Sequence, residues 1–194
     1  MRLPHWYTAD LHLGHEPTIR FCDRPFRDAD HMEAVILENL WNCVGPQDDL
    51  WILGDFAMGR NSRNDEWLRH RFDKLPGLRK HLIVGNHDRV KTLKLPWDSV
   101  SNFLEVRDDP KRLPNTLCHY PMVTWNHSRR GALQLFGHVH HNWKGTRNSV
   151  NVGVDVFDYK PVQLEDIQRR AKTLPVNVHW PDVEPGLDLE TGSM

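Results

Sequence analysis

Cysteine is scarce in this sequence, and its spacing supports no covalent framework. Cys22, Cys43 and Cys118 are three in number, and no two of them form a C-x-x-C motif. Neither a disulfide framework nor a thiolate zinc site is therefore expected, and a reducing cytoplasm is the compartment that fits best.

Long apolar runs are missing as well. No window of the sequence approaches the roughly 20 apolar residues that are needed to span a bilayer. The N-terminal residues lack the apolar segment of a secretory signal. We therefore expect a cytoplasmic protein that has no contact with a membrane.

Three common catalytic signatures are also absent. The sequence contains no G-x-x-x-x-G-K-[ST] loop, no G-x-S-x-G elbow and no H-E-x-x-H helix. Because these motifs are missing, the sequence does not support binding of a nucleoside triphosphate by a phosphate loop, serine hydrolysis or zincin-type proteolysis. The chemistry of this chain has to come from other polar side chains.

The charges nearly cancel, so that neither sign dominates. Lysine and arginine number 25 and acidic residues number 26, which gives a net charge of -1. The segment from Thr173 onward holds four of the acids and no base, so the rest of the chain carries 25 bases against 22 acids, or +3. This excess is too small for a dedicated nucleic-acid binder, but it leaves a nucleotide substrate open.

The length of 194 residues suits one domain with a single core. We expect this domain to cover residues 1–172. Residues 173–194 are rich in Pro, Asp and Glu and show little periodicity, so we expect a loosely ordered tail there.

Helical spacing of apolar residues appears in three stretches. The first begins at Asp28 or Asp30 and stops at Gly45-Pro46, and Trp41 is expected to lie in its buried face. Further helices are expected over residues 65–72 and from Pro161 to about residue 171.

Short apolar runs between these helices predict strands. Strands are expected at residues 6–9, 50–53, 82–84 and 133–136. The run at residues 50–53 does not alternate, as expected for a strand covered on both faces. Residues 149–156 alternate between polar and apolar side chains, as a strand with one wet face does. The alternation of strands and helices indicates an α/β layered fold.

Polar groups that bind metals follow four of the apolar runs, and a fifth run adds one imidazole. Crowding carboxylate, amide and imidazole groups at the ends of buried strands costs free energy, so such a cluster indicates a functional role. Any one of these motifs is a weak signal, and the first, taken alone, is better explained as a surface loop with a stray histidine. In chain order the five are D-x-H (Asp10, His12), G-D (Asp55), G-N-H-D (Asn86, His87, Asp88), a lone His119 and G-H-x-H (His138, His140).

Together and in this order, the five motifs resemble those of the calcineurin-like metallophosphoesterase family. The resemblance covers residues 6 to about 156. It implies the family's α/β sandwich, in which two β-sheets pack together and helices flank them. It also implies the hydrolysis of phosphate esters by a water or hydroxide that is activated at a dinuclear metal centre.

The resemblance further implies two overlapping sets of metal ligands. One set is Asp10, His12, Asp55 and His140, and the other is Asp55, Asn86, His119 and His138. Asp55 would bridge the two divalent ions. Oxygen and nitrogen ligands without a thiolate suit Mn²⁺, Fe or Zn²⁺ better than Ca²⁺, and we expect manganese first.

Catalysis and substrate contact are assigned to other side chains. By resemblance, His87 would contact the phosphate and act as general acid, and Asp88 would orient His87, although an ordinary turn carboxylate is an alternative for Asp88. His15 is a candidate pocket residue or an exposed histidine. Arg129 and Arg130, in a polar loop after His119, could pair with phosphate oxygens or form an exposed basic loop.

We therefore expect a phosphoesterase that acts on a small phosphate ester, a phosphodiester or a nucleotide. One alternative is a catalytically inactive, metal-binding interaction module of the same fold. Another is a metal-dependent nuclease, which would bind DNA or RNA in a salt-sensitive manner. The sequence names neither the natural substrate nor the oligomeric state.

Overall fold

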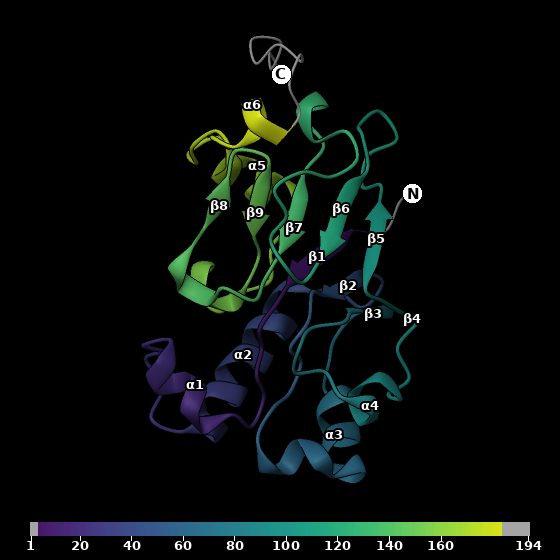
Figure 1. Cartoon of the computed structure of the whole chain (residues 1–194). Coiled ribbons are helices and arrows are strands. Elements are labelled where there is room, and N and C mark those ends of the chain that lie inside the picture. The colour runs from purple at the N-terminus through teal and green to yellow at the C-terminus, as the bar shows by residue number, and fades with distance from the viewer. Residues whose placement is uncertain (1–3, 184–194) are drawn as a thin grey trace.

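The computed structural model describes residues 4–183 and contains two β-sheets (Figure 1). The first sheet is wholly parallel, with the strand order β1-β2-β3-β4. Its strands are β1 (His5–Thr8), β2 (Asp49–Ile52), β3 (Arg79–Ile83) and β4 (Ser99–Ser101).

The second sheet is mixed and has the strand order β5-β6-β7-β9-β8. Its three central strands are parallel, and its two edge strands, β5 and β8, run antiparallel to their neighbours. The strands are β5 (Phe103–Val106), β6 (Asn115–Cys118), β7 (Gln134–Phe136), β8 (Gly145–Thr146) and β9 (Ser149–Asn151).

Helices and short 3-10 turns connect the strands (Figure 1). The α-helices are α1 (Glu16–Phe21), α2 (Ala29–Cys43), α3 (Asp65–Phe72), α4 (Val90–Leu93), α5 (Leu164–Ala171) and α6 (Trp180–Val183). The 3-10 helices are η1 (Arg60–Arg63), η2 (Ser128–Arg130), η3 (His140–Asn142) and η4 (Val154–Val156). No helix among residues 4–183 is long and apolar enough to cross a membrane.

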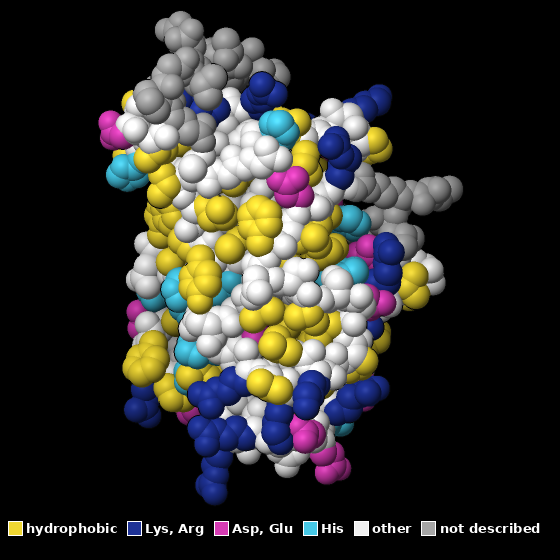
Figure 2. All heavy atoms as spheres, turned by 45° about the vertical axis from the view of Figure 1, so that its right-hand side comes forward, with side chains coloured by type: hydrophobic (Ala, Val, Ile, Leu, Met, Phe, Trp, Pro, Cys, Tyr) yellow, Lys and Arg dark blue, Asp and Glu magenta, His cyan; other side chains and the backbone are white. Residues whose placement is uncertain are grey.

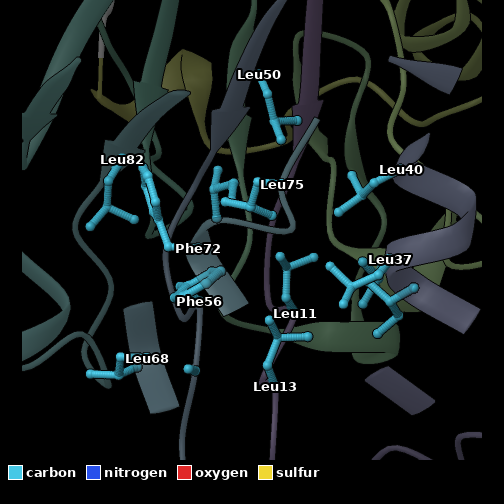
Figure 3. Close-up of a cluster of buried hydrophobic side chains, with 14 of the residues drawn as sticks. Leu11, Leu13, Leu37, Leu40, Leu50, Phe56, Leu68, Phe72, Leu75 and Leu82 are labelled. Carbon is cyan, nitrogen blue, oxygen red and sulfur yellow. The ribbon is translucent and has the colours of Figure 1, made fainter. Parts of the chain in front are cut away.

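Both faces of the parallel sheet are buried, which explains its continuous apolar runs. Leu50 and Leu82 point from one face into a cluster with α2 and α3, where Figure 3 shows Leu40 and Phe72 around the same apolar space. Trp51 on the opposite face belongs to a second cluster, which fills the space between the two sheets. This layering confirms the predicted α/β sandwich of two packed sheets with flanking helices.

The element boundaries follow local capping more closely than apolar pattern. Asp28 caps α2, since its carboxylate accepts a hydrogen bond from the His31 N–H at 2.7 Å. α5 begins only at Leu164, because Gln163 and Asp166 form a capping box there. Trp41, expected in the core, is 61% exposed, because the buried stripe of α2 runs through its neighbour Leu40.

The alternating stretch 149–156 is a strand only in its first three residues. The Asn151 side chain accepts a hydrogen bond from the Gly153 N–H at 2.8 Å, which turns the chain away from the sheet. Val154 then begins η4, and its N–H bonds to the Ala9 carbonyl at 3.1 Å. The period-two pattern therefore gave the correct strand start and the wrong strand end.

The beginning of the expected tail is packed against the domain. Trp180 is 7% exposed and its ring centroid lies 6.4 Å from that of Trp125. Its indole N–H donates to the Val123 carbonyl at 3.2 Å, and the Asn177 amide donates to the same oxygen at 2.8 Å. Residues 184–194 lie outside the described residues, and the domain boundary at residue 172 stays a prediction.

We predict that Trp180→Ala lowers the free energy of unfolding, by up to about 3–5 kcal/mol, because a buried indole is removed from a packed site. The control is Val178→Ala, since Val178 is 76% exposed. Urea denaturation of both variants measures the difference. A loss of less than about 0.5 kcal/mol for Trp180→Ala, the range of ordinary surface substitutions, would show that this contact does not hold in solution.

Candidate metal centre

The five polar motifs converge where the two sheets meet. Beyond the ends of β1 and β2, the chain segments continue side by side, and the His12 N–H donates to the Asp55 carbonyl at 2.9 Å. The second sheet adds the residues after β6 and β7, and there the Gly137 N–H donates to the His119 carbonyl at 3.0 Å. Segments from distant parts of the sequence thus meet at one edge.

The backbone is left-handed at most of the predicted ligands. Asp10, His12, Asp55, His138 and His140 have φ values of 59°, 50°, 57°, 70° and 50°. Positive φ is uncommon for residues other than glycine, and such strain gathers at functional sites. These five are more than half of the nine such residues in the described chain. The observation is independent of the motifs and selects the same side chains.

Two motif glycines allow the carboxylates to approach the backbone closely. A Cβ atom on Gly85 would lie 2.2 Å from an Asp55 carboxylate oxygen. A Cβ atom on Gly137 would lie 2.5 Å from an Asp10 carboxylate oxygen. Both distances are far below contact, so each glycine leaves room for the carboxylate of another motif.

Asp10, His12 and His140 form the first group of candidate ligands. One donor atom from each lies within 4.8 Å of the other two. The rings of His12 and His140 are stacked with their centroids 5.1 Å apart. Asp10 also accepts a hydrogen bond from the His138 N–H at 2.9 Å, which fixes its carboxylate in the group.

A second group surrounds Asp55. Its carboxylate Oδ2 lies 3.5 Å from His119 Nε2 and also 3.5 Å from His12 Nε2, which belongs to the first group. His119 Nε2 lies 3.1 Å from the Asn86 side-chain oxygen, and the ring of His138 lies 5.2 Å from that of His119. The structure therefore brings all seven predicted ligands together, with Asp55 between the two groups.

The donor set fits a metal ion. Both ring nitrogens of His12 are buried and have no hydrogen-bond partner among the described residues, although buried polar atoms are normally satisfied. The Nδ1 atom of His119 lies 2.7 Å from the Leu53 carbonyl, so this nitrogen donates, and Nε2 is the ring atom that faces the other candidate ligands. Such outer hydrogen bonds are typical of metal-binding histidines.

The charges of the group depend strongly on one another. Burial raises the pKa of Asp10 to about 6, although the charges of His119 and His140 act in the opposite direction. Burial would also raise the pKa of Asp55, but the hydrogen bond and charge of His119, with the charge of His12, lower it to about 2. Buried carboxylates here need a nearby positive charge, which a divalent cation supplies.

Sequence reasoning missed a buried chain of residues that holds His140. The Asp155 carboxylate lies 2.8 Å from His140 Nδ1, and Arg24 donates to both Asp155 oxygens at 2.7 and 2.9 Å. Arg24 also donates to the Asp10 and Leu11 carbonyls at 2.8 and 3.2 Å. Its side chain is fully buried. Arg24 thus joins the D-x-H segment to the histidine of the G-H-x-H motif.

Asp88 has a different partner from the one expected. Its carboxylate accepts hydrogen bonds from the N–H groups of Asp55, Gly85 and Phe56 at 2.8, 2.9 and 3.0 Å. These bonds hold the left-handed turn that carries Asp55. The prediction that Asp88 orients His87 is therefore replaced by a role in positioning Asp55.

His87 and His15 line the open side of the group. The side chain of His87 is 35% exposed, and its Nε2 lies 4.0 Å from Asp55 Oδ2. The ring of His12 lies 5.4 Å from the ring of His87 and 5.5 Å from that of His15. The structure thus places both histidines beside the candidate ligands, as the substrate-contact hypothesis requires.

Arg129 and Arg130 lie near the opposite end of the strands of the second sheet from the candidate ligands. β6 and β7 are parallel, so His119 and His138 leave the same end of the sheet, whereas η2 precedes the start of β7. The Ser128 carbonyl accepts from the Asn148 side chain at 2.8 Å, just before β9 begins. The structure therefore does not bring these arginines to the candidate ligands, because the chain returns along the sheet between the two parallel strands, and their contact with substrate stays a prediction.

We predict that Asp155→Asn weakens metal binding about 10–100-fold, because His140 loses the carboxylate that orients it. Asp158→Asn is the matched control, since Asp158 is an exposed aspartate three residues further along the chain. Titration calorimetry with Mn²⁺ measures both affinities, and a thermal melt of the metal-free proteins verifies folding. Equal affinities for the two folded variants would remove the positioning role of Asp155.

Comparisons with known proteins find sequence relatives and structural neighbours of this chain. No family model matches. The chain is 28% identical to the gene 66 protein of Mycobacterium phage D29, over 94% of this chain and 98% of that one. The structure of a protein of unknown function from Aquifex aeolicus is 28% identical, with a TM-score of 0.68, over 87% and 99% of the two chains. The structure of Pseudomonas putida nuclease MPE is 24% identical, with a TM-score of 0.40, over 70% and 61%. The likeness of fold rests on the Aquifex aeolicus structure.

Proposed function

We propose that this protein hydrolyses phosphate esters at a centre that holds two divalent metal ions. The observation that carries the proposal is the position of Asp55. One of its carboxylate oxygens lies 3.5 Å from imidazoles of two separate motifs, His12 and His119. A carboxylate between two sets of nitrogen ligands is what a dinuclear centre needs as a bridge.

The charge of such a centre favours phosphate. Two divalent ions bring +4, the carboxylates of Asp10 and Asp55 return -2, and the neutral ligands leave about +2. When bound, the ions lower the pKa of a water molecule and neutralise charge on phosphoryl oxygens. Nitrogen and oxygen ligands favour Mn²⁺, with Fe and Zn²⁺ as alternatives.

Other residues of the chain would position the metal ligands and contact the substrate. Asp88 holds the turn of Asp55, and Arg24 with Asp155 holds His140, so that the donor atoms stay converged. His87 lies on the exposed side, where its ring can contact a phosphoryl oxygen and give a proton to the departing oxygen. Holding donors in place before substrate arrives is the main contribution of a protein to such chemistry.

A catalytically inactive, metal-binding module of the same fold is the alternative. Such a module has no need of His87, nor of left-handed conformations at five residues, each of which costs about 1–3 kcal/mol. Strain that persists at the ligands supports a working site. We therefore favour hydrolysis, with phosphodiesters or nucleotides as the substrates.

We predict two metal ions per chain in the reloaded protein. Asp55→Ala should impair both sites, because its carboxylate faces both groups, whereas His140→Ala should mainly empty one. His141→Ala is the matched control, since His141 is adjacent to His140 and exposed. Elemental analysis after dialysis measures the stoichiometry. A single bound ion in an active wild-type protein would contradict the two-metal mechanism.

We predict that His87→Ala keeps both metals and loses about 10²–10⁴-fold in turnover of an ester with a poor leaving group, because the departing oxygen lacks its proton donor. A nitrophenyl ester should lose less, since its leaving oxygen hardly needs a proton. His70→Ala, an exposed histidine of α3, is the control. Steady-state rates on both esters are compared with metal content. Equal losses on the two esters would refute the general-acid role.

A further inference from the structure

A basic surface borders the candidate metal centre. It consists of residues 60–66, which form η1 and lead into α3, and residues 89–94, which form α4 and its flanks; we call it the η1–α4 surface. It carries five cations and two carboxylates, or +3, whereas the whole chain carries -1. The cations are Arg60, Arg63, Arg89, Lys91 and Lys94, all of them exposed.

The first half of this surface starts beside His15. The Met58 N–H donates to the Leu13 carbonyl at 3.1 Å, so the chain before η1 runs alongside the segment that leads from His12 to His15. A Cβ atom on Gly59 would lie only 2.7 Å from the Gly14 carbonyl oxygen. Arg60 follows directly, and η1 therefore leaves from the open side of the metal centre.

The second half starts beside His87. Arg89 follows Asp88 in the chain and occupies the N-cap position of α4. α4 and η1 contact each other, so the two halves form one continuous surface. Figure 2 shows Lys and Arg side chains gathered at the lower end of the molecule, with His side chains just above them on the left.

Most of these charges have no acidic partner. Lys91 pairs with Asp65 at 3.1 Å. Arg60, Arg63, Arg89 and Lys94 form no ion pair with any side chain of residues 4–183. Exposed cations gathered beside a phosphate-binding centre attract further phosphates of the same ligand.

The surface also lacks the aromatic rings that bases would stack on. Trp67 is partly buried, and the Arg71 guanidinium lies 4.1 Å from its ring centroid. Trp97, whose indole N–H donates to the Thr92 carbonyl at 2.8 Å, is buried. Val90 is the large apolar side chain that is exposed there, at 64%. Stacking platforms are how single-stranded bases are usually held, so this surface is suited to phosphate contacts alone.

We propose that the η1–α4 surface binds the phosphodiester backbone of a polynucleotide, without reading its bases, and leads one phosphate to the metal centre. The proposal rests on the proposed phosphoesterase function. In the reaction, water oxygen forms a new bond to phosphorus, the bond from phosphorus to the sugar oxygen breaks, and the departing oxygen takes a proton. The neighbouring phosphates stay on the basic side chains.

Binding is tested separately from cleavage by fluorescence anisotropy. The full chain is kept in chelator, so that no cleavage occurs, and is titrated onto a labelled 20-nucleotide DNA, as a single strand and as a duplex, at several salt concentrations. The variant carries Arg60→Gln, Arg63→Gln and Lys94→Gln. The control carries Arg130→Gln, Arg147→Gln and Lys172→Gln, three exposed cations outside the η1–α4 surface.

We expect the variant to bind the single strand about 100-fold more weakly at 0.1 M salt, with a salt slope that is smaller by about 2, because three phosphate contacts are lost. The control should match the wild type. Equal losses in variant and control, or no binding by the wild type, would overturn the proposal. Hydrolysis of a small nitrophenyl diester by a wild type that binds no DNA would leave the phosphoesterase function standing. DNA binding without hydrolysis of any ester would instead refute that function and keep the surface.

Discussion

The structure depends on holding two buried carboxylates, Asp10 and Asp55, within reach of several histidines. Asp10 is fully buried and Asp55 is 1% exposed. Both carboxylates and three of the histidines have left-handed backbones, which cost about 1–3 kcal/mol each. The whole stability of a domain is only about 5–15 kcal/mol. The rest of the fold therefore has to determine these conformations firmly, and a cation that satisfies the donors would offset part of the cost.

Two features supply this support. Parallel strands of both sheets deliver the motifs to one edge, and their packed faces fix where each strand ends. Two buried side chains then hold the turns themselves. Asp88 accepts hydrogen bonds from three backbone N–H groups at and near Asp55. Arg24 donates to the carbonyls of Asp10 and Leu11 and to the carboxylate of Asp155. Such hydrogen bonds to charged groups are each worth about 1.5–3 kcal/mol, which is comparable to the strain that they stabilise.

The sequence predicted the parts of this arrangement that are local. Apolar runs placed the central strands, and the helix at residues 65–72 was correct in both bounds. Five short motifs picked out the seven side chains that converge as candidate ligands. What it did not show depends on contacts between distant segments. Arg24 stands in no recognisable pattern, and its partner Asp155 lies 131 residues away. Asp88 is adjacent to His87 in the chain, but it turns back toward Asp55. Arg129 and Arg130 follow His119 in the chain, but the connection between two parallel strands places them at the other end of the sheet's strands.

The central claim is that Asp55 bridges two metal ions, and crystallography with anomalous scattering tests it most directly. Crystals of the manganese-loaded protein would be measured on both sides of the manganese absorption edge. The account predicts two anomalous peaks, roughly 3.5–4 Å apart, with the Asp55 carboxylate between them. A single peak, or two peaks of which one lies away from Asp55, would contradict it.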